Sequence, residues 1–377
     1  MENQAVLSDQ IVFGPDDVDL AKSPLRASIP IEETYVMGAF NPSLTRLPNG
    51  NLVMFVRIAE GLREPTRSGY VHAIRWDADK GFVLDEYDVD EVDAKDPRKF
   101  RLVTYPYQVM ALTSISWLLP VELTPEGNAV VAVHYDKILS PATTYQEYGV
   151  EDARVSLIDG TYYMTTCSVS AQRHSTTLYT SQDGLNFELR GIVLDHQNKD
   201  MLYFEGKVGG KFYALTRPLG DLYFAYPPES PYHAGPSINL SSSPDGLHWK
   251  PVDTPMIRPR RGSQSTMRMG GGAQPILTDR GWLILYHGVE TEGVVGVYRT
   301  FWALADRDDP SKILEIHDDT PLLESKPELT EHLKDRYYLT DVVFTTGIVD
   351  AGDRYVVASG ELDLVCRITL IRKEAFA

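Results

Sequence analysis

Ile158-Asp159-Gly160-Thr161-Tyr162-Tyr163-Met164-Thr165-Thr166 is a turn followed by a run of β-branched and aromatic residues. Glycine accepts the positive φ of a tight turn, and the residues that follow suit a pleated, half-buried strand. The same pattern occurs five times in the chain. The runs that follow a glycine-containing turn are residues 51–57, 161–166, 211–217, 282–288 and 353–360. Each copy predicts a β-hairpin.

A polar or glycine-bearing segment lies upstream of each hairpin and can supply an inner strand. These segments are Asn41-Pro42-Ser43, Glu151–Arg154, Asn198–Asp200, Gly270–Gly272 and Asp341–Gly347. Five such repeats predict an all-β fold, a five-bladed β-propeller, which brings residues distant in sequence around one central funnel. We expect a single catalytic domain over residues 31–377, preceded by a short N-terminal arm over residues 1–30.

The chain has 377 residues, 43% of them hydrophobic and 24% charged, which is enough apolar material for a large core. Its formal net charge of −17 argues against nucleic acid and anionic membranes as partners, because both require a basic surface. No segment approaches the roughly 20 apolar residues of a membrane span, and no secretory leader is visible. We therefore expect a cytoplasmic protein, with Cys167 and Cys366 as buried thiols rather than a disulfide.

Three segments interrupt the repeat. Residues 85–101 are highly charged and are expected to form an exposed connection inside the first blade. Residues 219–240 are rich in proline and tyrosine, and residues 256–269 contain four arginines. Long irregular loops of this kind are typical of functional segments, so we expect both to shape substrate specificity.

The sequence contains no recognisable metal or cofactor motif. HExxH, CxxC, GxSxG and GxxxxGK are all absent, so neither a metal nor a cofactor is expected. Gly270-Gly271-Gly272 lacks the strand-then-helix context of a dinucleotide site. Its glycines are expected to permit close backbone approach at an inner strand.

Carboxylates and bases lie at the predicted inner edges of the blades. Glu151-Asp152-Ala153-Arg154 places an acid pair beside an arginine at the start of a strand. Because side chains alternate along a strand, we expect Glu151 and Asp152 to face opposite sides, with one of them toward a central cavity. Asn198-Lys199-Asp200 opens the next blade, Asp363 lies in the last one and Arg57 ends the first hairpin.

Each of these residues also has a purely structural interpretation. Asp152 and Arg154 suit an ion pair between blades, Asn198 and Asp200 suit the capping of a turn, and Arg268 suits a solvated loop. Their shared position relative to the repeat favours a binding site. A cavity lined by Asp, Asn, Lys and Arg with aromatic neighbours is typical of sugar recognition, because hydroxyl groups need polar partners and aromatic rings cover apolar sugar faces.

The chain resembles glycoside hydrolase family 130, the β-mannoside phosphorylases and related inverting β-mannosidases, over roughly residues 38–370. The resemblance implies a five-bladed propeller. It rests on several segments in the expected order, namely Phe40-Asn41-Pro42-Ser43, Arg57, Glu151–Arg154, Asp159–Met164, Asn198–Lys207, Arg217-Pro218, Gly270–Ile276, Gly281–Gly288 and Asp309–Lys312.

The resemblance implies specific residue roles. The general acid of the family lies in an E-D-P-R motif, which corresponds to Asp152 here, with Ala153 in place of the proline. In the family's phosphorylases the proton is thought to reach the leaving oxygen through a mannose hydroxyl. The positions expected to contact the sugar and the anion are Asn41, Arg57, Asn198, Asp200 and Asp363.

Inverting cleavage also needs a nucleophile opposite the leaving group, and two nucleophiles remain open. Phosphate is held by cations, for which Arg57, Lys199, Lys207 and Arg268 are the candidates. Water needs a second carboxylate as base, for which Glu205 is the candidate.

The retained cations favour phosphorolysis of a β-mannoside or mannooligosaccharide to α-mannose 1-phosphate. An inverting exo-β-mannosidase and, more remotely, a carbohydrate-binding propeller without catalysis are the alternatives. Linkage, chain length, leaving-group sugar and oligomeric state are not specified by the sequence.

Overall fold

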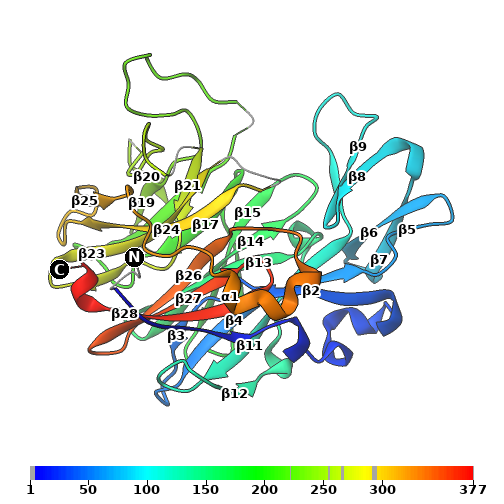
Figure 1. Ribbon diagram of the computed structural model, residues 1–377, viewed down its shortest axis with the longest axis horizontal. Coiled ribbons are helices and arrows are strands. Elements are labelled where there is room, and N and C mark those ends of the chain that lie inside the picture. Colours follow the sequence, from blue (N-terminus) through cyan, green and yellow to red (C-terminus); the bar gives the residue numbers. More distant parts are fainter. Residues whose placement is uncertain (1–4, 221, 254, 265–266, 291–294, 377) are drawn as a thin grey trace.

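The computed structural model describes residues 5–220, 222–253, 255–264, 267–290 and 295–376, and most of them form β-strands and their turns (Figure 1). The single α-helix within these ranges is α1 (Pro327–Thr330), which continues into a 3-10 turn at Glu331–Arg336. The predicted all-β class is confirmed. None of the helices in the described ranges has the length and apolar character needed to cross a membrane.

Five antiparallel sheets of four or five strands make up most of the molecule. Sheet 1 contains β2 (Thr34–Phe40), β3 (Thr45–Arg46), β4 (Leu52–Leu62), β11 (Ser114–Leu123) and β12 (Val130–Val133). Sheet 2 contains β13 (Val150–Ile158), β14 (Thr161–Val169), β15 (His174–Ser181) and β16 (Glu188–Leu194). Sheet 3 contains β17 (Asn198–Tyr203), β18 (Phe212–Pro218), β19 (Asn239–Ser243) and β20 (Lys250–Pro251).

The two remaining large sheets complete the chain. Sheet 4 contains β21 (Arg268–Gly271), β22 (Ile276–Thr278), β23 (Gly281–Glu290), β24 (Val297–Ala305) and β25 (Ile313–His317). Sheet 5 contains β26 (Val343–Asp350), β27 (Arg354–Glu361), β28 (Val365–Arg372) and β1 (Val6–Phe13). All five predicted hairpins are confirmed, because each glycine-containing turn connects two paired antiparallel strands.

The five sheets follow one another in a ring. β13 contacts β4 on one side and β17 on the other, β17 contacts β21, and β24 contacts β26. β26 in turn contacts β3, so the last sheet returns to the first. Apolar side chains fill the space between neighbouring sheets, as where Val56 and Trp117 of sheet 1 belong to one cluster with Val356 and Ile368 of sheet 5.

The N-terminal residues contribute to this ring. β1 pairs antiparallel with β28 from Val6↔Ile371 to Phe13↔Cys366 and forms the outer strand of sheet 5. Sheet 5 is therefore built from both ends of the chain. The proposed domain boundary at residue 30 stays a prediction.

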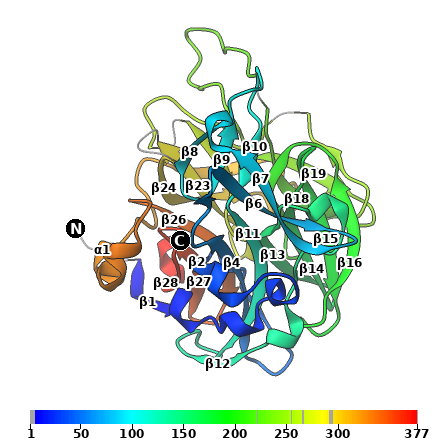
Figure 2. The same ribbon diagram turned by 90° about the vertical axis from the view of Figure 1, so that its right-hand side faces the viewer.

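The charged residues 85–101 lie, as expected, in a largely exposed connection within the first sheet, but this connection is folded into strands. Residues 63–113, between β4 and β11, form an insertion of two three-stranded sheets (Figures 1 and 2). Its strands are β5 (Thr66–Arg67), β6 (Tyr70–Asp77), β7 (Gly81–Asp88), β8 (Val92–Asp96), β9 (Lys99–Leu102) and β10 (Met110–Leu112). The insertion has a small apolar core of its own, which includes Val71, Phe100 and Ala111.

The two long loops hold each other in place. Isolated β-bridges join Tyr232 to Arg260 and Ile238 to Ile257, and the Arg258 guanidinium lies over the Tyr232 ring. Residues 221, 265 and 266 of these loops lie outside the described residues. Cys167 and Cys366 are free and buried, as expected from the sequence.

Candidate active site

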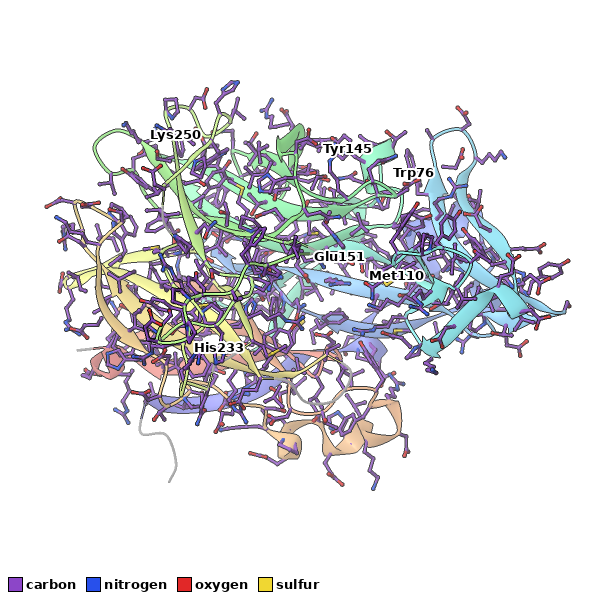
Figure 3. All side chains as sticks on the ribbon, turned by 90° about the horizontal axis from the view of Figure 1, so that it is seen from above. Trp76, Met110, Tyr145, Glu151, His233 and Lys250 are labelled. Atoms are coloured by element: carbon purple, nitrogen blue, oxygen red, sulfur yellow. The ribbon has the colours of Figure 1, made fainter. Side chains whose placement is uncertain are left out.

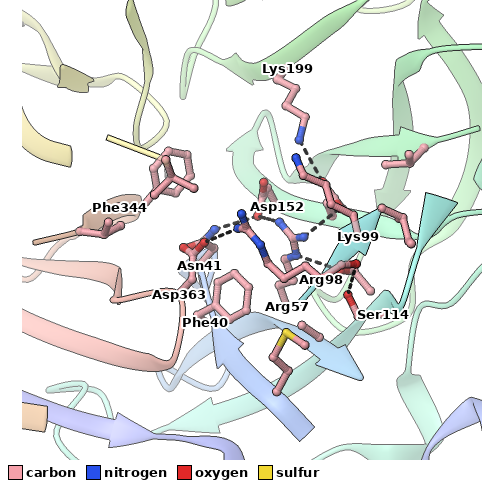
Figure 4. Close-up of a pocket in the computed structure, with 18 of the residues that line it drawn as sticks. Phe40, Asn41, Arg57, Arg98, Lys99, Ser114, Asp152, Lys199, Phe344 and Asp363 are labelled. Carbon is pink, nitrogen blue, oxygen red and sulfur yellow. Dashed lines mark hydrogen bonds and ion pairs between the residues drawn. The ribbon is translucent and has the colours of Figure 1, made fainter. Parts of the chain in front are cut away.

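A cavity of about 370 Å³, a volume typical of small-molecule sites, opens where the inner strands meet the insertion (Figure 4). In Figure 3, Glu151 lies in the interior of the molecule, with Met110 of the insertion on one side and His233 of the long loop on another. The ionisable lining residues are Arg57, Arg98, Lys99, Glu151, Asp152, His174, Lys199, Asp200, Arg217, Tyr298, Tyr338 and Asp363.

Asp152 is held by two neighbours from sheet 1. Its Oδ1 atom accepts hydrogen bonds from Asn41 Nδ2 at 3.0 Å and from Arg57 Nη1 at 3.0 Å. Burial raises the pKa of Asp152, but the charges of Arg57 and Lys199 outweigh burial and hold this pKa below its usual range. Asp152 is therefore a carboxylate in this structure.

Glu151 faces the same cavity, so the expectation that Glu151 and Asp152 face opposite sides is wrong. The pairing of β13 with β14 shifts register between Glu151 and Arg154, and Asp152 takes a positive φ of 50°. Such a bulge re-aims a side chain and breaks the alternation of the strand. The strand thereby presents two consecutive carboxylates to one cavity.

Glu151 bridges two cations. Its Oε1 atom lies 2.8 Å from Arg57 Nη2 and its Oε2 atom 3.1 Å from Lys199 Nζ. Burial raises the pKa of Glu151, but the charges of Arg57 and Lys199 hold it below its usual value. Burial lowers the pKa of Lys199, but the negative charges of Glu151 and Asp152 raise it above its usual value despite the nearby Arg57, so both groups are ionised. Arg57 is further fixed by Ser116, whose Oγ atom accepts from Arg57 Nε at 2.9 Å.

Asp200 lies at the centre of a buried ion network in the wall of the cavity. Its carboxylate lies 3.0 Å from Arg217 Nη2 and 3.6 Å from Arg154 Nη2. Arg154 Nε donates to the backbone oxygen of Gly272 at 2.6 Å, which ties sheet 2 to sheet 4. Burial and then Arg217 and Arg154 hold the pKa of His287 far below its ordinary value, so His287 is neutral.

Asp363 also lines the cavity and contacts Arg98 of the insertion. Arg98 Nη1 lies 3.8 Å from Asp363 Oδ2, and the Arg98 guanidinium lies over the Tyr338 ring. Burial raises the pKa of Asp363 despite the opposing charges of Arg57 and Arg98. This contact connects the insertion to sheet 5 across the cavity.

Six of the ten candidate residues line this cavity. They are Asn41, Arg57, Asp152, Lys199, Asp200 and Asp363. Asn198 lies directly behind them, where its Nδ2 atom donates to Thr176 and its Oδ1 atom accepts from the backbone N–H of Arg217. Arg268 does not line the cavity, but it donates to the Tyr298 hydroxyl at 2.7 Å, and Tyr298 does line it.

Lys207 and Glu205 are not among the lining residues. Lys207 Nζ lies 2.8 Å from Asp159 Oδ2, in the turn between β13 and β14. Glu205 is held by the backbone amide of Leu157, and burial raises its pKa to about 7. Both side chains lie toward the turns of the inner hairpins, away from the cavity.

Several lining residues were not among the sequence candidates. Lys99 and Arg98 come from the insertion, His174 from β15 and Tyr338 from the segment before β26. Asp96-Pro97-Arg98-Lys99 carries a turn signal that predicts a hairpin tip, but not its contact with the cavity. Within the described part of the chain, no group of three or more His, Cys, Asp or Glu side chains could hold a metal ion.

Comparison with known proteins identifies the family of this chain. The profile of glycoside hydrolase family 130, described as β-1,4-mannooligosaccharide phosphorylase, matches residues 116–376. The chain belongs to glycoside hydrolase family 130. The resemblance inferred from the sequence motifs is confirmed.

Several relatives are similar over much of the chain. A β-1,2-mannobiose phosphorylase of Listeria innocua serovar 6a is 32% identical over 89% of each chain. A 1,2-β-oligomannan phosphorylase of a Thermoanaerobacter strain is 30% identical over 62% of this chain and 72% of its own. A solved structure of β-1,2-mannobiose phosphorylase from Listeria innocua in complex with β-1,2-mannobiose has 29% identity, a TM-score of 0.80 and 98% coverage of both chains.

Proposed function

We propose that the protein is an inverting β-mannoside phosphorylase that cleaves a terminal β-mannosidic bond with phosphate and releases α-mannose 1-phosphate. The observation that carries the proposal is the position of Asp152, a single carboxylate oriented by Asn41 and Arg57 inside a cation-rich cavity. Five Lys and Arg side chains line this cavity against four carboxylates, in a chain of net charge −17. Family membership and the phosphorylase relatives support the same reaction.

In this mechanism Asp152 is the general acid. A general acid must carry a proton, whereas the charges of Arg57 and Lys199 favour the ionised form of Asp152. A phosphate bound beside these cations offsets their charge, which raises the pKa of Asp152 and favours its protonation. Phosphate then serves both as nucleophile and as the charge that prepares the acid.

Asn41, Arg57, Asp200 and Asp363 are proposed to contact the mannose and the anion, with Asn198 and Arg268 supporting them from behind. We assign no catalytic role to Lys207 or Glu205, since neither lines the cavity. Without Glu205 the hydrolase alternative loses its candidate base. We also propose that the ring of five sheets is a five-bladed β-propeller whose axis carries this cavity.

The substrate proposed first is β-1,2-mannobiose, because three of the curated relatives are named for β-1,2-linked mannosides. The family profile and a fourth relative are named for β-1,4-linked mannooligosaccharides, so that linkage is the alternative. The cytoplasmic location stays a prediction.

The test is to incubate the purified protein with β-1,2- and β-1,4-mannobiose, with and without phosphate, and to identify the products. We expect α-mannose 1-phosphate and mannose, formed only when phosphate is present. Equal cleavage in phosphate-free buffer would reject phosphorolysis and support the hydrolase. Binding of the disaccharides without any cleavage would support the non-catalytic alternative.

A further inference from the structure

The tip of one hairpin of the insertion lies at the cavity in a fixed position. β8 and β9 end in the pair Asp96↔Lys99, with Pro97 and Arg98 between them. Asp96 Oδ1 accepts from the Arg98 backbone N–H at 3.0 Å and from Arg98 Nε at 2.9 Å. These hydrogen bonds from Arg98 to Asp96 close the turn at the hairpin tip, as is usual for an aspartate at the start of a tight turn.

The same tip is tied to the start of β11. Thr113 Oγ1 donates to the Pro97 oxygen at 2.6 Å, and the Thr113 backbone N–H donates to the Arg98 oxygen at 2.9 Å. β11 lies in sheet 1, where it pairs with β4, which carries Arg57. The hairpin tip is thus fixed relative to the strands that orient Asp152.

Arg98 is neutralised by carboxylates on both sides of it. It pairs with Asp96 at 2.9 Å and approaches Asp363 at 3.8 Å. The other guanidinium groups and the second ammonium group that line the cavity are also paired, with Glu151, Asp152 or Asp200. The protein itself therefore balances each of these charges.

Among the described Lys and Arg side chains that line the cavity, Lys99 is the exception, because it has no ion-pair partner. Its side chain is half-buried and lines the cavity, yet the structure gives it neither a hydrogen bond nor an ion pair. Burial lowers the pKa of Lys99. The charges of Asp96 and Glu151 oppose this shift and those of Arg98 and Lys199 add to it, so Lys199 lies within electrostatic reach of Lys99. Figure 4 shows the two lysines entering the cavity from different strands.

We propose that the Lys99 ammonium, delivered by the insertion, is a phosphate-binding residue that acts together with Lys199. An ammonium group in a partly desolvated cavity is destabilised until it gains an anion, and a charge-assisted hydrogen bond to phosphate supplies one. The inference deepens the proposed phosphorolysis and rests on it. It also assigns the insertion a direct role in phosphate binding.

The experiment compares Lys99→Gln with wild type in both directions of the reaction. We expect the KM for phosphate to rise about 10- to 100-fold, as for the loss of one charge-assisted hydrogen bond, with the KM for mannobiose changed less than about threefold. In the synthetic direction the KM for α-mannose 1-phosphate should rise similarly. Lys99→Arg, which keeps the charge, should restore most of the phosphate affinity.

Lys95→Gln is the matched control. Lys95 lies in β8 of the same insertion, is 89% exposed and pairs with Asp93, so its loss removes the same charge away from the cavity. We expect its phosphate KM to equal that of wild type. Phosphate-induced thermal stabilisation, measured without sugar, provides a binding readout for every variant, including any with low activity.

The outcomes separate the two proposals. Cleavage by wild type without phosphate defeats the proposed function itself. Phosphate-dependent wild type with an unchanged phosphate KM in Lys99→Gln overturns only the role of Lys99. A rise confined to the KM for mannobiose also overturns it, because Lys99 would then contact the sugar.

Discussion

Four cavity residues share an uncommon backbone conformation. Asn41, Asp152, Asp200 and Asp363 have φ values of 47°, 50°, 56° and 52°, in the left-handed region that asparagine and aspartate tolerate better than other non-glycine residues. Residues held in such conformations cluster at functional sites, where the surrounding structure compensates their cost. Asparagine and aspartate therefore have two functions at these positions. Their side chains line the cavity, and their backbone tolerates the left-handed conformation that the inner strands adopt there.

Asp152→Asn tests the general acid directly. Asparagine keeps an oxygen for Asn41 and Arg57, so the fold should persist while kcat falls about 10²- to 10⁴-fold on mannobiose. An aryl mannoside whose leaving group needs no protonation should lose far less activity, which a merely structural defect would not explain. Asp136→Asn, at a 72% exposed side chain, is the control, and equal loss on both substrates would contradict the role.

Glu205→Gln tests the alternative base and carries a pH signature. Burial raises the folded-state pKa of Glu205 from 4.5 to about 7, so the folded chain binds this proton more tightly than the unfolded chain. Stability should therefore fall as pH rises from about 4.5 to 7, and the Gln variant should exceed wild type by ~3 kcal/mol at pH 8 but by less at pH 5. Urea unfolding at both pH values measures this, and cleavage should persist. An identical difference at both pH values, or loss of cleavage, would refute this account.

At the scale of single elements, β21 brings backbone unusually close to the ion network. A Cβ built on Gly270 would lie against Asp200 Oδ2 and 2.6 Å from His287 Cε1. This explains the glycine run, whose expected role of close backbone approach is confirmed. At the ion network, β21 of sheet 4 contributes backbone atoms, whereas sheets 2 and 3 contribute the charged side chains of Arg154, Asp200 and Arg217.

Gly270→Ala should displace Asp200 from Arg217. Overpacking of this kind costs about 1–3 kcal/mol, and we expect kcat/KM to fall alongside because Asp200 lines the cavity. Gly220→Ala is the control, since its nearest atom would lie at 3.4 Å. Thermal unfolding and steady-state kinetics measure both effects. Wild-type behaviour of Gly270→Ala would show that the network adapts.

The first and last strands of the whole molecule are joined by a buried ion cluster. Asp9 of β1 lies 2.8 Å from Arg367 of β28, and Arg367 also pairs with Glu361 of β27 at 2.9 Å. The Arg367 side chain is 1% exposed. The cluster thereby joins strands from both ends of the chain within sheet 5.

Asp9→Ala should destabilise the protein by about 3 kcal/mol, because it leaves Arg367 buried and incompletely paired. Asp353→Ala removes a carboxylate that is 75% exposed beside Arg354, and an exposed pair of this kind should change stability by less than about 0.5 kcal/mol. Denaturant unfolding compares the two variants. Equal stabilities would show that the Asp9 carboxylate contributes little to holding β1 on sheet 5.

The sequence by itself determined the all-β class, the five hairpins and the buried thiols. These depend on turn chemistry and strand periodicity, which are local properties that neighbouring residues express without the rest of the chain. Six residues of the cavity, including Asp152, were indicated by their place in the repeat together with the resemblance to glycoside hydrolase family 130. Only the tertiary structure decided that Glu151 joins Asp152 in the cavity, that Arg98 and Lys99 reach it, and that Lys207 and Glu205 do not. A bulge reverses strand alternation, and an insertion folds back over sheets far along the chain, so these outcomes follow from non-local packing that no sequence spacing encodes.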